Sequence, residues 1–109
     1  MLESDPYFQE IEALLKKVER GEKPIVLERS ILENPYFNLL LYLAYSYVGK
    51  TYEQIKEFLK KEEVPEVEKL LEANLIDLDE RSKRYKLTKK GVILCNAYII
   101  HGIIKNEAK

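Results

Sequence analysis

The chain has 109 residues and a mass of 12.9 kDa, enough for one domain with a single hydrophobic core. Apolar residues make up 46% of it and charged residues 34%, which excludes a disordered chain and a collagen-like repeat. The formal net charge of −1 provides no overall attraction to nucleic acid, so any such attraction depends on how the charges are distributed.

Several function classes are excluded by what the sequence lacks. The longest apolar run, Leu39–Tyr45, is far shorter than the ~18–20 residues of a membrane span. The first residues lack the basic-then-apolar form of a signal peptide, so we expect a cytoplasmic protein. Cys95 and His101 are single, which excludes an intrachain disulfide and a Cys/His zinc cluster. The four glycines lie too far apart for a phosphate loop. We therefore predict no catalytic residues, no metal site, no cofactor and no enzymatic activity.

Two helix starts carry nearly the same letters. Asp5-Pro6-Tyr7-Phe8 and Asn34-Pro35-Tyr36-Phe37 each place a capping Asp or Asn before a proline at the first helical position. The first start predicts an amphipathic helix over 6–20 that stops at Gly21. The second predicts a helix over about 35–48 that Gly49 ends.

The 35–48 helix is apolar nearly all round, so we expect it to form the buried centre of the domain. Its tyrosines at 42, 45 and 47 are then core residues with their hydroxyls at the edge. The preceding stretch, residues 24–33, is consistent with either a short strand or a helical turn.

Two shorter helices follow. Thr51-Tyr52-Glu53-Gln54 is a capping box, which predicts a helix with Ile55 on its inner face. A further helix over about 64–74 carries the apolar residues Val64, Val67, Leu70 and Leu71. It ends near Asn74, a residue type that tolerates the left-handed conformation after a helix.

The apolar period then changes from 3.6 to 2. Residues 75–79 and 84–87 alternate, and the polar stretch between them has the length of a hairpin loop. Thr88 can cap a last helix over roughly 89–105, in which Cys95 is a small buried hydrophobe. The whole chain is thus predicted to be mainly α with a small β-hairpin, an α+β fold.

This order of elements resembles a winged helix-turn-helix domain of the ArsR-like and MarR-like regulators. Four pieces carry the resemblance in the correct order: Ile31-Leu32-Glu33-Asn34-Pro35 with Leu39–Leu43, Lys50-Thr51-Tyr52-Glu53-Gln54-Ile55, Leu70-Leu71-Glu72-Ala73-Asn74-Leu75-Ile76, and Tyr85-Lys86-Leu87-Thr88-Lys89-Lys90-Gly91. It implies a single domain over 1–109, with a helical extension at 1–33, a winged-helix core at 34–90 and a C-terminal helix at 89–109. It also implies a small DNA-binding transcriptional regulator.

The sequence departs from this family where DNA is normally read. Between Ile55 and Ile76 the chain is about one helical turn shorter than the family pattern, and residues 51–75 hold four Lys against seven Glu. Base readout relies on Arg, Lys, Asn or Gln, and carboxylates repel phosphates. Three interpretations of the acidic helix 64–74 stay open: an ordinary solvated face, a surface for a protein partner, or a helix that reads specific bases.

The predicted wing carries the opposite charge. Residues 81–90 hold six Lys or Arg and no acid. They either contact DNA phosphates or keep an exposed hairpin edge from pairing with neighbours. The resemblance implies double-stranded DNA as the partner, with these candidate contacts: Lys50, Lys60, Lys61, Arg81, Lys83, Arg84 and Lys86. The alternative is a winged-helix adaptor that binds another protein and no DNA.

The terminal helices offer more apolar surface than one small domain needs. Two-fold dimers are the commonest oligomers, so we expect a homodimer, or else the first helix folds back over the last within one chain. The predicted dimer interface consists of Ile11, Leu15, Tyr98, Ile99 and Ile103. The abundance of Lys and Glu suits a thermophile.

Overall fold

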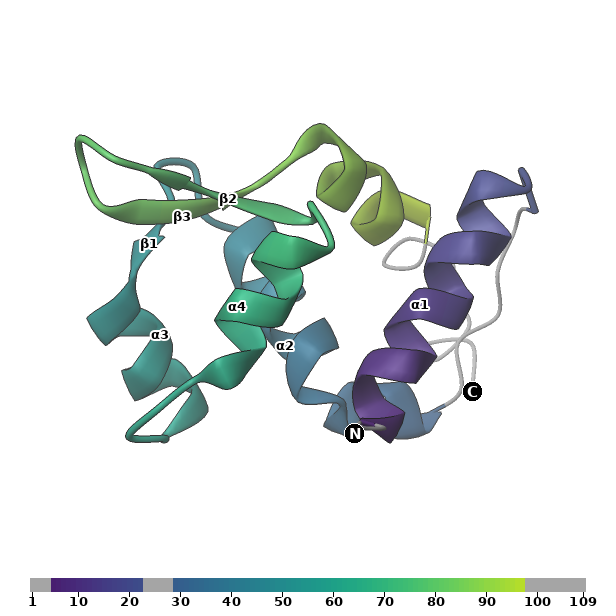
Figure 1. Cartoon of the computed structure of the whole chain (residues 1–109), viewed down its shortest axis with the longest axis horizontal. Coiled ribbons are helices and arrows are strands. Elements are labelled where there is room, and N and C mark those ends of the chain that lie inside the picture. The colour runs from purple at the N-terminus through teal and green to yellow at the C-terminus, as the bar shows by residue number, and fades with distance from the viewer. Residues whose placement is uncertain (1–4, 23–28, 98–109) are drawn as a thin grey trace.

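The computed structural model describes residues 5–22 and 29–97 of the chain. Its first two helices begin where the sequence predicts (Figure 1). α1 (Pro6–Glu19) is capped by Asp5, whose carboxylate accepts from the amides of Tyr7 and Phe8. α2 (Pro35–Ala44) is capped in the same way by Asn34. Because proline at the first position needs no hydrogen-bond partner for its nitrogen, both starts are set locally.

The segment before α2 is a 3-10 helix, η1 (Arg29–Glu33). It corresponds to the helical-turn alternative for residues 24–33, while residues 23–28 lie outside the described part of the chain. Ile31 of η1 is buried in the core. The turn therefore anchors the chain just before the cap of α2.

The predicted end of α2 is wrong by four residues. The helix stops at Ala44, and Tyr45 and Ser46 close it by donating to the carbonyls of Leu41 and Leu43. Gly49, at φ +91°, then leads the chain into a strand. Tyr45 and Tyr47, predicted to be core residues, are 73% and 100% exposed. The cause is tertiary, because the chain must leave the helix early to reach the edge of the sheet.

The next two helices lie where the sequence predicts them. α3 (Tyr52–Leu59) begins with a complete capping box between Thr51 and Gln54. It ends at Lys60, which adopts the left-handed conformation. α4 (Pro65–Glu72) is shorter than the predicted helix over 64–74. The chain leaves it through Asn74, which has φ +63° as its residue type allows.

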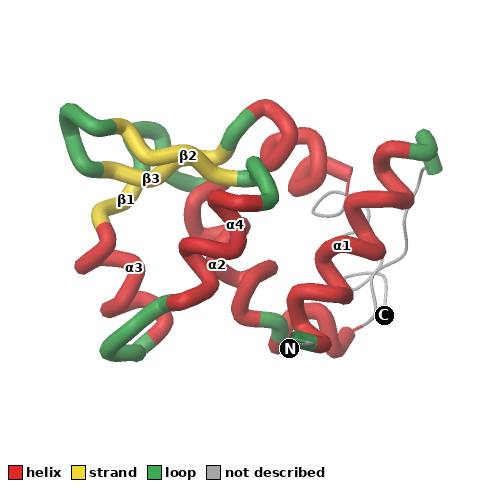
Figure 2. Tube along the Cα trace, viewed as in Figure 1, coloured by secondary structure: helices red, strands yellow, loops and turns green. Residues whose placement is uncertain are grey.

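A three-stranded antiparallel sheet lies beside these helices, with the strands in the order β1-β3-β2 (Figure 2). The hairpin of β2 (Ile76–Asp79) and β3 (Arg84–Leu87) confirms the predicted alternation. The edge strand β1 (Lys50–Thr51) was not predicted, because two residues contain no period. Its pairing with β3 brings Lys50 opposite Tyr85 and Thr51 opposite Arg84.

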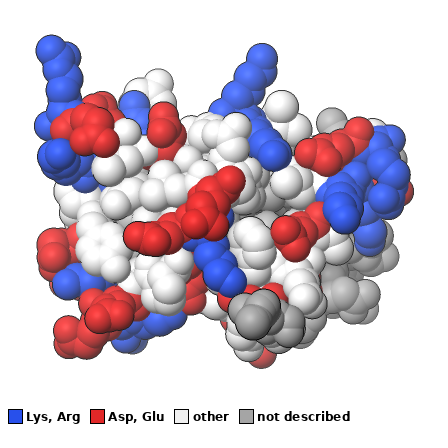
Figure 3. Space-filling model, viewed as in Figure 1, with Lys and Arg blue, Asp and Glu red and all other residues white. Residues whose placement is uncertain are grey.

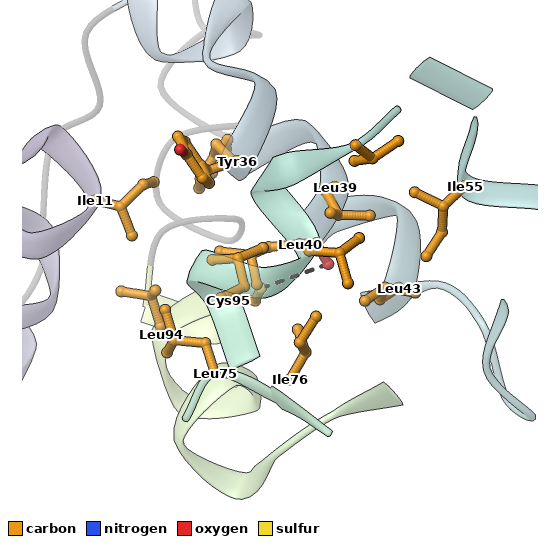
Figure 4. Packing of buried hydrophobic residues seen from close by; sticks show 14 of the residues in the cluster. Ile11, Tyr36, Leu39, Leu40, Leu43, Ile55, Leu75, Ile76, Leu94 and Cys95 are labelled. Atoms are coloured by element: carbon orange, nitrogen blue, oxygen red, sulfur yellow. Dashed lines mark hydrogen bonds between the residues drawn. The ribbon is translucent and has the colours of Figure 1, made fainter. Parts of the chain in front are cut away.

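The last described element is a helix over 89–97. Thr88 caps it by accepting from the amide of Gly91, and its own hydroxyl donates to the carbonyl of Asn74. The rest of the predicted helix 89–105 lies outside the described residues. Cys95 is buried as expected, and its thiol donates to the carbonyl of Leu40 at 3.9 Å (Figure 4).

α2 is the centre of the core, as its composition predicts. Leu39 and Leu40 have no exposed surface, and around them pack Ile11 of α1, Ile55 of α3 and Leu94 of the last helix (Figure 4). The structure is therefore mainly helical with a small antiparallel sheet, which confirms the α+β prediction. Among the described residues no helix has the length and apolar character needed to cross a membrane.

Candidate nucleic-acid interface

The hairpin β2–β3 presents two cations at its tip. The Asp79 carboxylate accepts from the amides of Arg81 and Ser82 at 2.9 and 3.5 Å, which fixes the turn. These hydrogen bonds, that of Arg81 foremost, lower the pKa of Asp79, so its carboxylate stays charged. Arg81 and Lys83 project into solvent, and Lys83 makes a 3.3 Å ion pair with Glu80. Arg81 is thus the tip cation without a carboxylate partner among the described residues.

The outer face of the hairpin is less basic than the sequence count indicates. The strand register places Asp79 across from Arg84 and Asp77 across from Lys86. Side chains directly opposite each other on one face are close neighbours, so each of these two basic residues has an acidic residue beside it. Residues 76–87 hold four Lys or Arg and three Asp or Glu, a net charge of +1. The period-2 alternation of residues 75–79 was the signal for this pairing, and counting residues 81–90 alone missed it.

Two of the predicted DNA contacts have structural partners at the edge of the sheet. The Arg84 guanidinium donates to the carbonyl of Gly49 at 3.0 Å, which ties β3 to the chain entering β1. The Lys50 ammonium lies 5.1 Å from the ring centroid of Tyr42, at cation–π distance. Both side chains are half-buried. Both side chains therefore make contacts within the fold at the edge of the sheet and do not project from the hairpin.

The structure does not bring Lys60 and Lys61 to the wing. They lie in the segment between α3 and α4, which is at the lower left of Figure 1, whereas the hairpin tip is at the upper left. The Lys61 ammonium is 2.7 Å from a carboxylate oxygen of Glu66, which is buried. Lys60 is exposed. Of the seven predicted contacts, Arg81, Lys83, Arg84 and Lys86 lie on the hairpin, and all of these except Arg84 are exposed.

The exposed side of α4 is acidic. Glu66, Val67 and Leu70 face the core, which leaves Glu68 and Glu72 on the opposite side of the helix in solvent. Acidic side chains lie over the centre of the face shown in Figure 3, where α4 is in front in Figure 1. DNA laid on this side of α4 would bring its phosphates against side chains of like charge.

Only two of the five predicted dimer-interface residues are among the described residues of the chain. Ile11 is 1% exposed in the single chain and Leu15 packs against the same core, so Ile11 has no surface to offer a partner. Tyr98, Ile99 and Ile103, like His101, lie outside the described residues. The part of the predicted interface other than Ile11 therefore stays a prediction.

Cys95 has the surroundings of a packing residue. Burial raises the pKa of its thiol to about 12, so it carries no thiolate near neutral pH. Within residues 5–22 and 29–97, no three His, Cys, Asp or Glu side chains come together as metal ligands.

Comparisons of this chain with known protein families, with curated proteins and with solved structures gave no significant match.

Proposed function

We propose that the chain is a winged helix-turn-helix protein that binds the backbone of double-stranded DNA through its wing and acts in transcription regulation. The observation that carries the proposal is the order of elements: α2, β1, α3, α4 and the hairpin, with β1 paired to the far side of β3. This order agrees with the one expected for a winged helix, in which α3 and α4 would be the helix-turn-helix, and so supports the proposal. The wing in this assignment is the β2–β3 hairpin with Arg81 and Lys83 at its tip.

The charge distribution supports contact with phosphates rather than with bases. Phosphate contacts position a protein without reading sequence, and they need only exposed cations. Arg81, Lys83 and Lys86 are exposed on the wing, whereas α4 exposes Glu68 and Glu72. We therefore expect weak, sequence-independent binding that depends strongly on salt.

We also propose that the protein works as a homodimer through its terminal helices. Val92 and Ile93 are 42% and 45% exposed on the last described helix. Ile93 lines a groove of about 500 Å³ together with Leu15 and Val18 of α1. The rest of its lining is polar, and a second copy seated there would cover the apolar side chains. Light scattering at ~50 µM tests it, and a mass near 13 kDa rather than 26 kDa refutes it.

The experiment on DNA is a salt titration of a mixed-sequence duplex. About three phosphate contacts predict a log–log slope of about −2.7 for one bound chain, which is roughly a 40-fold loss of affinity between 50 and 200 mM salt; a dimer with both chains on the duplex doubles the slope. The double variant Arg81→Glu with Lys83→Glu removes the tip cations and is expected to abolish binding.

The matched control is Lys16→Glu with Lys17→Glu. These residues are exposed on α1, and the double substitution changes the net charge by the same amount. It is expected to leave most of the affinity intact. Absence of wild-type binding at ~10 µM protein in low salt, or equal losses in the two double variants, refutes wing contact.

A second function is favoured by the acidic side of α4. The carboxylates of Glu68 and Glu72 have no hydrogen bond or ion pair to another described residue. A charged helix face that is unsuited to DNA is available to a protein, and the chain then acts as an adaptor.

A further inference from the structure

A groove runs between α4 and the sheet, and its floor is apolar and aromatic. It has a volume of about 530 Å³ and is bounded by α4, the chain that leads into it, and two tyrosines from other elements. Tyr52 comes from the start of α3 and Tyr85 from the middle of β3. Between them and α4 the floor is completed by Val64, Val67 and Leu71. No pattern in the sequence predicts this groove, because its residues lie on three separate elements.

The two tyrosine rings are held in place. Their centroids are 6.5 Å apart with the planes tilted by 52°. The Tyr52 hydroxyl accepts from the amide of Val64 at 3.0 Å, which fixes that ring against the N-terminal end of α4. A preformed aromatic floor costs little ordering on binding, so it suits a partner side chain better than a mobile surface does.

The rim of the groove is acidic. Glu63, Glu68 and Glu72 line it and are exposed. Lys69 also lines it, but its ammonium is 3.7 Å from the Asp5 carboxylate and 5.4 Å from the ring centroid of Phe8. Its charge is therefore directed towards α1. Among the described residues, the three glutamates have no cationic partner.

Charge and aromatic surface together indicate what the groove would take. A carboxylate rim attracts Lys or Arg, and a tyrosine face attracts a cation by its quadrupole. The apolar floor adds burial for an aliphatic side chain. DNA is disfavoured, because its phosphates would lie against three carboxylates.

We propose that this groove binds a basic segment of a protein partner, with Arg or Lys side chains at the glutamate rim and an aliphatic side chain packed on the floor that Tyr52 and Tyr85 form. The proposal rests on the adaptor function and gives its partner a chemical class. A segment bound there lies beside the wing without using the tip cations Arg81 and Lys83. DNA contact and protein contact are then separable by mutation.

The test is fluorescence polarisation with a short labelled peptide of alternating arginine and leucine. Wild-type protein is expected to bind it, and Glu68→Lys with Glu72→Lys is expected to weaken binding by roughly tenfold or more, since two attractions become two repulsions. A peptide with glutamate in place of arginine should not bind.

The matched control is Glu53→Lys with Glu57→Lys. These residues have the same i, i+4 spacing and are exposed on α3, outside the groove. The control is expected to keep wild-type affinity for the peptide. Circular dichroism verifies that all variants are folded. A second variant, Tyr85→Leu, keeps the charges and tests the aromatic floor, with an expected loss of several-fold.

The outcomes separate this proposal from DNA binding. Glu68→Lys with Glu72→Lys should weaken binding of the peptide and strengthen binding of DNA. Arg81→Glu with Lys83→Glu should have the opposite effects on the two affinities. If the α4 variant and the α3 control lose equal amounts of affinity for the peptide, the proposed role of the groove is wrong. It is also wrong if the wild-type protein does not bind the peptide. If the α4 variant instead abolishes self-association of the wild-type chain, the occupant is a second copy and the proposal is wrong.

Discussion

Asn34 is the polar residue that joins the first two helices, and replacing it with Ala should destabilise the protein strongly. It has no exposed surface. Its carbonyl oxygen accepts from the amides of Tyr36 and Phe37 at 2.9 and 3.3 Å, which caps α2. Its amide nitrogen donates at 2.9 Å to the carbonyl of Tyr7 and, also at 2.9 Å, to the carboxylate of Glu10.

The expected loss follows from these four hydrogen bonds. Loss of an N-cap costs about 1 kcal/mol. The two hydrogen bonds that the Asn34 amide donates add about 1 kcal/mol each, because the acceptor of one is a charged carboxylate and both are shielded from water. The total is about 3 kcal/mol of unfolding free energy. With a slope of about 1.5 kcal/mol per M, the urea midpoint falls by about 2 M.

Thr51→Ala is the control in the same urea titration. Thr51 caps α3 through one 3.2 Å bond from the amide of Gln54 and is only half-buried. Its loss should cost about 1 kcal/mol. If Asn34→Ala costs no more than Thr51→Ala, the link from Asn34 to α1 contributes nothing and the reasoning is refuted.

Three further predictions concern single sites. Gly91→Ala should lower Tm by roughly 5–10 °C in a thermal scan, because the added Cβ would lie 2.3 Å from the carbonyl oxygen of Leu75, and an unchanged Tm contradicts this. Cys95 should react with a thiol reagent at pH 8 only in denaturant, because its thiol is buried with a pKa of about 12; fast labelling of the native protein would show the helix to be open. Burial raises the pKa of Asp5, but hydrogen bonds from Tyr36 and the Phe8 amide outweigh it and lower the pKa below 3.8. The stabilisation from the charged carboxylate is therefore complete above that value and is lost as pH falls through the lower folded pKa; acid titration of Asp5→Asn should lack this loss.

The adaptor and DNA-binding proposals make different use of one fold. The wing contributes exposed cations at a tip, and α4 contributes carboxylates beside a preformed groove. Because the two surfaces share no residue, charge reversal on one is not expected to impair the other. If both proposals hold, one protein would bind DNA weakly through the hairpin and a basic segment through the groove.

Local signals in the sequence determined where most elements begin. Asp5 and Asn34 before prolines, and the Thr51–Gln54 capping box, fix helix starts through hydrogen bonds within three residues. The alternation around the hairpin likewise fixes which side chains of β2 and β3 share a face. Such features depend on neighbours along the chain, so they can be deduced without the fold.

What the tertiary structure decided depends on partners distant in sequence. β1 is a strand because β3 lies beside it, and α2 stops at Ala44 because the chain must reach that edge. Register placed Asp77 and Asp79 opposite Lys86 and Arg84, two of the basic residues counted in 81–90, and packing placed Tyr52 and Tyr85 side by side. A sequence shows which charges and rings are present, but electrostatic and packing energies depend on distances in space, which only the folded chain sets.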